Sequence, residues 1–116
     1  MTGIVFFATT DVPTITAFYQ SHFGATIWLE QPDCTILKLD NILLGFCERP
    51  SADTEGIITI VVESRREVDR YHERLGNIAK DAPKLNERYD IYHFYLTDPE
   101  GRSVEIQSFE HETRPV

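Results

Sequence analysis

The first fifty positions begin with a short apolar segment and continue with apolar residues at helical spacing. Ile4 to Thr9 is rich in β-forming residues, which is typical of a buried strand. Thr10 or Asp11 offers a helix N-cap, and Pro13 suits the first helical turn because its missing N–H needs no partner there. The pattern predicts a strand and then a helix from about Val12 to Phe23.

Three further strands are predicted in this half of the chain. Their ranges are Ala25 to Glu30, Cys34 to Leu39 and Ile42 to Glu48, and all three contain β-branched or aromatic residues. Pro32-Asp33 and Asp40-Asn41 separate them as turn signals. The first half is therefore expected to be a βαβββ module.

The second half repeats this order after a polar linker at 49–56. Ser64 and Glu67 have the spacing of a capping box, and Asp98-Pro99-Glu100-Gly101 has the residues of a tight reversal. Tyr71 and Gly76 follow Tyr19 and Gly24 by 52 positions, as a duplicated unit would place them. The predicted elements are a strand at 57–62, a helix up to residue 76, a weak strand at 84–88, and strands at 91–96 and 103–109.

Length and charge limit the classes of protein that fit. A chain of 116 residues is the size of one domain, and no apolar run approaches the roughly 20 residues that cross a membrane. A net charge of −8 with scattered Lys and Arg argues against a nucleic-acid partner. Met1 to Thr10 has no basic residue before its apolar stretch, unlike a secretory signal. We expect a cytoplasmic protein that does not bind membranes.

The two cysteines follow from the predicted hairpin. A two-residue turn at Asp40-Asn41 pairs Leu39 with Ile42, and counting outward pairs Cys34 with Cys47. Such a pair would lie about 4.5 Å apart at Cα, within reach of a disulfide. Because the cytosol is reducing, free thiols are expected there.

Motifs in both halves match one known pattern. The first half has Thr10-Asp11, Phe18-Tyr19 and Phe23-Gly24, and the second has Asp98-Pro99-Glu100-Gly101 followed by Val104-Glu105. In these features the chain resembles the vicinal oxygen chelate superfamily of glyoxalases, bleomycin-resistance proteins and extradiol dioxygenases. The resemblance implies a single α+β domain over residues 1–116. Two βαβββ modules, at about 3–48 and 57–109, would form curved mixed sheets around a cavity.

The resemblance also indicates where a metal would bind. Metal-dependent members place a His on the first strand, a His on the fifth and a Glu on the last. The matching positions here are Ile4, Ile57 and Glu105, or Gly56 in place of Ile57 if the strand is shifted by one. Only Glu105 can coordinate an ion, whereas catalytic metals need about three protein ligands. We therefore expect no metal and no other cofactor.

Strand alternation, taken with the family pattern, predicts a ligand pocket. Gln107 shares a face with Glu105, and His93 and Tyr95 are expected to face the same cavity. If His93 and Glu105 meet, they form either a structural hydrogen bond or a catalytic acid/base pair. The expected ligand-binding residues are Phe6, Trp28, Thr59, His93, Tyr95, Glu105 and Gln107.

Three functions fit these residues. We favour a metal-independent protein, similar to the bleomycin-resistance type, that binds a small cationic or aromatic molecule and forms a homodimer. An alternative is a metal-dependent or acid/base lyase, isomerase or dioxygenase that uses Glu105 and His93. A third is an interaction module whose dimer interface is its function, with the pocket filled by its own aromatic side chains.

Overall fold

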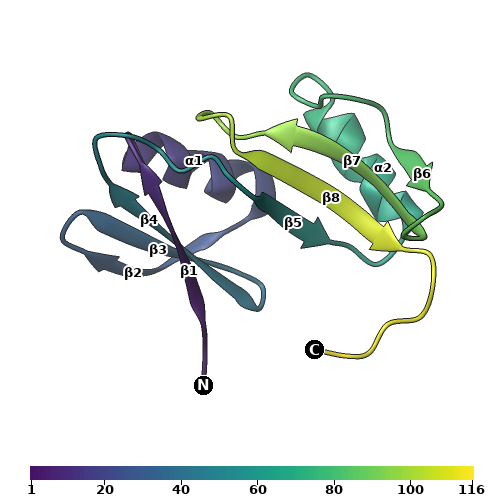
Figure 1. Cartoon of the computed structure of the whole chain (residues 1–116), viewed down its shortest axis with the longest axis horizontal. Coiled ribbons are helices and arrows are strands. Elements are labelled where there is room, and N and C mark those ends of the chain that lie inside the picture. Colours follow the sequence, from purple (N-terminus) through teal and green to yellow (C-terminus); the bar gives the residue numbers. More distant parts are fainter. The chain divides into compact units, whose positions relative to one another are not determined.

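The computed structural model describes all 116 residues, which form two compact units. The first unit contains Met1–Thr54 with the turn Asp98–Gly101, and the second contains Glu55–Thr97 and Arg102–Val116. Each unit has one helix and one four-stranded mixed sheet (Figure 1). This confirms the predicted α+β class and the two βαβββ modules, whereas the single domain stays a prediction.

The first unit follows the predicted order closely. Its sheet has the order β1-β4-β3-β2, in which β1 is parallel to β4 and the other neighbours are antiparallel. The elements are β1 (Ile4–Thr9), α1 (Val12–Phe23), β2 (Thr26–Gln31), β3 (Cys34–Leu39) and β4 (Ile42–Glu48).

Helix α1 has a cap at both ends. The Asp11 side chain accepts a hydrogen bond from the Thr14 amide at 3.2 Å, which satisfies an N–H that the helix itself cannot. Gly24 ends the helix in the left-handed conformation at φ 71°, which costs glycine little because it has no Cβ. Ile15 and Tyr19 are fully buried against the sheet.

The cysteine prediction was half right. Cys34 and Cys47 lie opposite each other in the β3–β4 ladder, as the Asp40-Asn41 turn predicted. They are joined by a disulfide with their Cα atoms 4.0 Å apart, so the expectation of free thiols is wrong for this structure. The ladder itself supplies the reason, because it holds the two side chains on the same face at bonding distance whatever the compartment.

Strand β2 begins one residue later than predicted. Ala25 is buried and follows the helix cap, while the strand extends to Gln31. Its register against β3 shifts between Ile27 and Leu29, which makes Trp28 the extra residue of a β-bulge. Every residue of this edge strand is exposed.

The second unit repeats the topology with the order β5-β8-β7-β6. Strand β5 is parallel to β8, and β8–β7 and β7–β6 are antiparallel. Strand β6 is shorter than the weak strand predicted at 84–88, and the other bounds agree within one residue. The elements are β5 (Ile57–Val61), α2 (Arg65–Leu75), β6 (Lys84–Asn86), β7 (Ile91–Thr97) and β8 (Ser103–Phe109).

Helix α2 begins as its capping residues predict. The Ser64 side chain accepts a hydrogen bond from the Glu67 amide at 3.3 Å. Gly76 at the other end stays right-handed, unlike Gly24, because the chain continues in a turn in which the Ala79 amide donates to the Leu75 carbonyl. Neither helix is long and apolar enough to cross a membrane.

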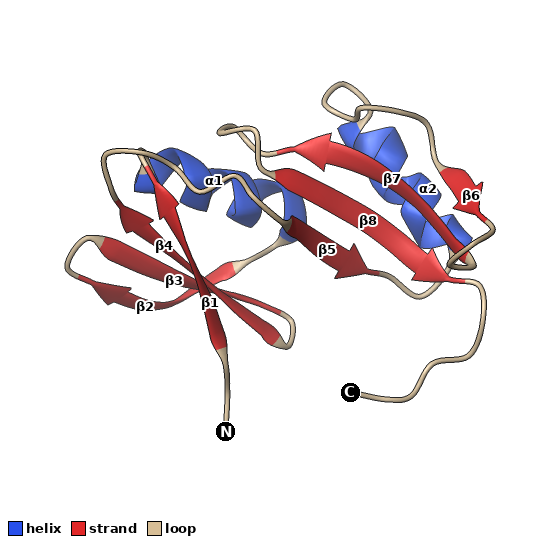
Figure 2. Ribbon diagram, in the orientation of Figure 1, coloured by secondary structure: helices blue, strands red, loops and turns tan.

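Helix α2 covers only one face of its sheet (Figure 2). Tyr92 and Phe94 of β7 contact the helix, since Tyr92 donates to Asp69 at 2.7 Å and the Phe94 ring meets His72 edge-on. Side chains alternate along a strand, so the neighbouring positions of β7 point to the opposite, open face. That open face carries the candidate site.

Candidate functional site

The strand register brings the predicted polar residues of the second unit onto the open face. Glu105 in β8 lies between Thr59 in β5 and Tyr95 in β7 as ladder partners. Gln107, two residues further along β8, is paired with His93. Alternation was enough to group these five side chains because the strands have no bulge here.

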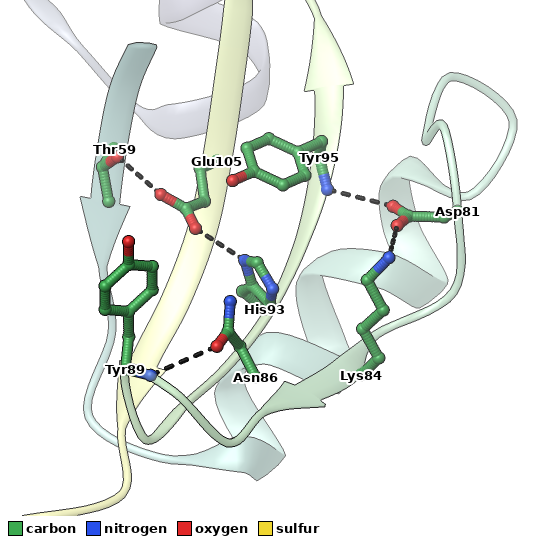
Figure 3. A network of polar contacts seen from close by, with 8 residues as sticks. All are labelled: Thr59, Asp81, Lys84, Asn86, Tyr89, His93, Tyr95 and Glu105. Atoms are coloured by element: carbon green, nitrogen blue, oxygen red, sulfur yellow. Dashed lines mark hydrogen bonds and ion pairs between the residues drawn. The ribbon is translucent and has the colours of Figure 1, made fainter.

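Glu105 is the centre of this group (Figure 3). Its carboxylate is almost fully buried and accepts a hydrogen bond from the Thr59 hydroxyl at 2.8 Å. Its other oxygen lies 2.6 Å from Nδ1 of His93, a side chain that is also nearly enclosed. A buried charge needs such partners, because removing a carboxylate from water without them is costly.

Two more side chains turn donors toward Glu105. With its amide nitrogen facing the carboxylate, Gln107 donates to both oxygens at 3.2 Å. Burial raises the pKa of Tyr95, and the charge of Glu105 and a hydrogen bond to it raise it further. Tyr95 therefore stays a neutral phenol at physiological pH, with its hydroxyl oriented toward Glu105 (Figure 3). An ionised carboxylate has about four acceptor sites, and these four protein donors match them.

The same face contains a cavity of about 390 Å³. This volume lies in the lower part of the range of small-molecule sites, about 300–1,000 Å³. Its lining combines aromatic side chains with the polar groups of Glu105 and His93. The residues that line it are Asn86, Tyr89, Ile91, His93, Tyr95, Glu105, Gln107 and Phe109.

His93 lines this cavity and has one ring nitrogen that the protein leaves without a partner. The residue is 4% exposed, and its Nδ1 is held by Glu105. Nε2 makes no hydrogen bond within the protein. Nε2 is also not fully buried. The fully buried polar side-chain atoms that lack a partner belong to Thr16 and Ser108. Nε2 therefore keeps some exposure, in a residue that lines the cavity.

Asn86 of the neighbouring strand β6 presents a donor beside His93 (Figure 3). Its side-chain oxygen accepts a hydrogen bond from the Tyr89 amide at 3.2 Å, which fixes the orientation of the amide group. The nitrogen of that amide group has no partner in the protein. The cavity thus offers both an unused ring nitrogen and an unused N–H donor.

The rim beside Tyr95 is held by a charged loop. Asp81 accepts a hydrogen bond from the Tyr95 amide at 3.2 Å and forms an ion pair with Lys84 at 3.2 Å. Partial burial acts to raise the pKa of Asp81, but the Tyr95 hydrogen bond and Lys84 outweigh it and leave the pKa below 3.8. The amide of Lys80 also donates to the Tyr95 carbonyl, so this loop continues the sheet beside β7.

Phe6 and Trp28 belong to the first unit. Both are about half exposed, and neither lines the cavity described above, so their predicted role stays a prediction. Phe6 is paired with Gly45 at the third position of the β1–β4 ladder, where the β5–β8 ladder has Thr59 with Glu105. The first unit therefore has the apolar pair Phe6 and Gly45 where the second unit has the polar pair Thr59 and Glu105.

Four cavity residues lie outside the predicted ligand-binding set, namely Asn86, Tyr89, Ile91 and Phe109. Alternation places Phe109 on the face of Glu105, and the same rule extends to Ile91, its ladder partner. Asn86 and Tyr89 had no comparable signal. They belong to a three-residue strand and the turn after it, where no periodicity can be measured.

Comparisons with known proteins identify the fold. No protein-family model matches the sequence, and no curated protein matches it. Several solved structures do match the chain. A lactoylglutathione lyase from Agrobacterium tumefaciens has a TM-score of 0.76 at 21% identity, over 92% of each chain. This chain has the vicinal oxygen chelate fold.

Two further solved structures have the same fold as this chain. An integron cassette protein from the mobile metagenome of the Halifax Harbour sewage outfall has a TM-score of 0.80 at 16% identity, over 94% of this chain and 98% of its own. The fosfomycin resistance protein FosX from Listeria monocytogenes has a TM-score of 0.76 at 19% identity, over 91% and 90%. Identities this low establish the fold alone.

The metal positions of the vicinal oxygen chelate pattern do not fit an ion in this chain. The two His positions of the pattern are occupied by Ile4 and Ile57, which cannot bind an ion. Their ladder partners are Leu43 and Ser103, and the residue paired with Glu105 is Thr59. No group of three or more His, Cys, Asp or Glu side chains could hold a metal. The one remaining carboxylate, Glu105, already has protein donors on both oxygens.

Proposed function

We propose that this protein binds a small molecule, without a metal, in the cavity on the open face of the second sheet. The observation that carries the proposal is the state of His93, whose side chain is nearly enclosed while its Nε2 has no partner in the protein. A buried polar atom normally has a hydrogen-bond partner, and an unused one in a cavity is the natural contact of a ligand.

Aromatic and charged groups support the kind of ligand predicted from the sequence. Tyr89, Tyr95 and Phe109 offer ring faces to a flat or cationic molecule, and the Glu105 charge favours a cation over an anion. Because the oxygens of Glu105 are already used by protein donors, we expect its charge to act mainly through His93 and through space.

Metal independence is supported by the lack of a ligand set around Glu105. The test is elemental analysis of untagged protein purified without chelators, together with thermal melts with and without divalent ions. We expect less than stoichiometric metal and an unchanged Tm. Stoichiometric metal, or a Tm raised by the ion as tight binding to the native state requires, would overturn this part of the proposal.

Ligand binding is tested by a fragment screen with calorimetric confirmation. The screen should contain aromatic cations, neutral hydrogen-bond donors and aromatic carboxylates. We expect saturable binding of cations or neutral donors, lost in Glu105→Ala and retained in Tyr92→Phe, whose hydroxyl lies on the helix side of the sheet. Equal affinity in Glu105→Ala would show that the site lies elsewhere.

An enzymatic function is the second candidate, and one observation favours it. His93 and Glu105 lie 2.6 Å apart, a geometry in which a carboxylate orients an imidazole for proton transfer. The similarity in fold to a lactoylglutathione lyase and a fosfomycin resistance protein adds lyase activity and fosfomycin inactivation to the reactions to assay. Turnover abolished in His93→Asn but not in Tyr92→Phe would favour an enzyme over a binding protein.

The assembly and the compartment also belong to this proposal. We infer a homodimer, on the resemblance to a superfamily with dimeric members, and a location in the cytoplasm. The Cys34–Cys47 disulfide follows from the strand register and does not decide the compartment, so the assembly and the location are tested separately. Sedimentation tests the dimer, and cell fractionation tests the location.

A further inference from the structure

We infer that the cavity selects ligands that donate an N–H or O–H to Nε2 of His93, and that Glu105 is the positioning residue that makes this nitrogen an acceptor. The inference rests on the proposed binding function, and it names the ligand chemistry of that same site. In the hydrogen bond between the ligand and His93, the ligand is the donor and the histidine nitrogen is the acceptor.

Glu105 is surrounded by side chains that donate hydrogen bonds to it. Thr59 donates its hydroxyl to one oxygen at 2.8 Å, and Gln107 offers an amide N–H to both oxygens at 3.2 Å. Both partners are donors, so Glu105 acts as a carboxylate, which accepts hydrogen bonds and donates none. The contact at 2.6 Å with Nδ1 of His93 therefore needs the proton on the histidine nitrogen.

The position of that proton determines the other ring nitrogen. In a neutral imidazole one nitrogen carries the proton and the other has a free lone pair, so a proton on Nδ1 leaves Nε2 as an acceptor. The ring cannot turn freely to exchange them. It is 4% exposed and packs edge-on against Tyr95 with ring centroids 5.2 Å apart.

The consequence is selection by hydrogen-bond direction. A ligand with an N–H or O–H can pair with Nε2, whereas a ligand with only acceptors leaves two lone pairs facing each other in a partly enclosed site. Sites built for one direction of hydrogen bond reject the wrong partner strongly, because a buried group then loses its hydrogen bond to water without replacement.

The tautomer can be observed directly. Long-range ¹H–¹⁵N correlation spectra of histidine-labelled protein, at about pH 8 so that an ordinary imidazole is neutral, distinguish the two tautomers. We expect Nδ1 of His93 to be protonated and Nε2 unprotonated. In Glu105→Gln the charge is lost, and the two nitrogen signals should move toward each other as the tautomers interchange. A protonated Nε2 in the wild-type protein would overturn the inference.

Matched probes test the selection itself. Phenol and anisole differ by one methyl group, and only phenol donates a hydrogen bond. We expect phenol to shift the Nε2 signal saturably and to bind at least about tenfold more tightly than anisole, which corresponds to about 1.4 kcal/mol. His93→Asn can keep a donor toward Glu105 while it removes Nε2. This variant should fold as the wild type does and bind both probes equally.

The outcomes separate this inference from the proposed function. If both probes bind in the cavity with equal affinity to the wild-type protein, the inference fails and the binding function stands. If neither phenol, anisole nor any fragment of the screen binds, the binding function fails. A preference for phenol that persists in His93→Asn would assign the selection to another group, such as Asn86, and would also overturn the inference.

Discussion

The Tyr19 hydroxyl donates a hydrogen bond to the Asp98 carboxylate at 2.9 Å, across 79 positions of sequence. Both side chains are buried, and both belong to motifs by which the chain resembles the vicinal oxygen chelate superfamily. Next to this bond, Glu100 accepts hydrogen bonds from Thr9 and from the Thr10 amide. The motif residues of the first helix and of the late turn therefore stabilise the structure of the first unit, and they do not line the cavity of the second.

The Tyr19–Asp98 bond should contribute measurably to stability. Tyr19→Phe removes one donor from a buried carboxylate, and hydrogen bonds to charged groups are worth about 1.5–3 kcal/mol. We expect the free energy of unfolding in urea to fall by that amount. Tyr89→Phe is the control, because the Tyr89 ring is 61% exposed and its hydroxyl has no partner, and it should change stability by less than about 0.5 kcal/mol. Similar losses in both variants would contradict the prediction.

Local signals were sufficient for most of the fold. Caps at Asp11 and Ser64 defined the helix starts, and the Asp40-Asn41 turn fixed the register that places Cys34 opposite Cys47. These features depend on neighbouring residues only, so one sequence reveals them. The strand β2 was predicted one residue early because its boundary and bulge depend on packing against β3.

The site could be predicted only in part. Alternation grouped Glu105 with Gln107, and the pattern of the superfamily placed His93 on the same face, where the strand register has it. The donors that occupy Glu105 and the free Nε2 of His93 depend on side-chain orientation, which periodicity does not describe. Asn86 was beyond reach for another reason, since its three-residue strand forms only because β7 pairs with it.

The disulfide should stabilise the first unit. Cys34 and Cys47 are separated by 13 positions, and closing a loop of about this size removes unfolded-state entropy worth about 3 kcal/mol. We expect reductant to lower the free energy of unfolding by about that amount. The double variant Cys34→Ser/Cys47→Ser should be equally less stable and insensitive to reductant. Two reactive thiols in untreated, denatured protein would show that the bond does not form.

Gly45 should be required because the Phe6 ring lies directly on it. A Cβ at position 45 would be 2.3 Å from Cδ1 of Phe6, so the ring must move. We expect Gly45→Ala to destabilise the protein by about 1–3 kcal/mol, as overpacking does. In the Phe6→Ala background the same change should be neutral or stabilising by about 0.5–1 kcal/mol, since alanine is better than glycine in a strand. Equal effects in both backgrounds, measured by urea unfolding, would contradict the contact.

The Asp81 loop should make stability depend on acid pH. Partial burial opposes ionisation, but the Tyr95 hydrogen bond and Lys84 outweigh it and lower the pKa of Asp81 below 3.8. A carboxyl whose pKa is lower in the folded state stabilises the protein above its ordinary pKa. That contribution disappears as the pH falls through the folded value. Asp81→Asn should therefore reduce the Tm at pH 7, and the difference from the wild type should shrink below about pH 3.

Thermal melts between neutral and acid pH test this prediction with a matched control. Glu87→Gln changes an exposed carboxylate of the same segment that makes no hydrogen bond or ion pair, so it should leave the Tm nearly unchanged at pH 7. A constant difference between Asp81→Asn and the wild type at every pH would mean that the side chain acts by its shape and not by its charge. Because Asp81 holds the backbone of Tyr95, the variant should also weaken any ligand bound against the Tyr95 ring.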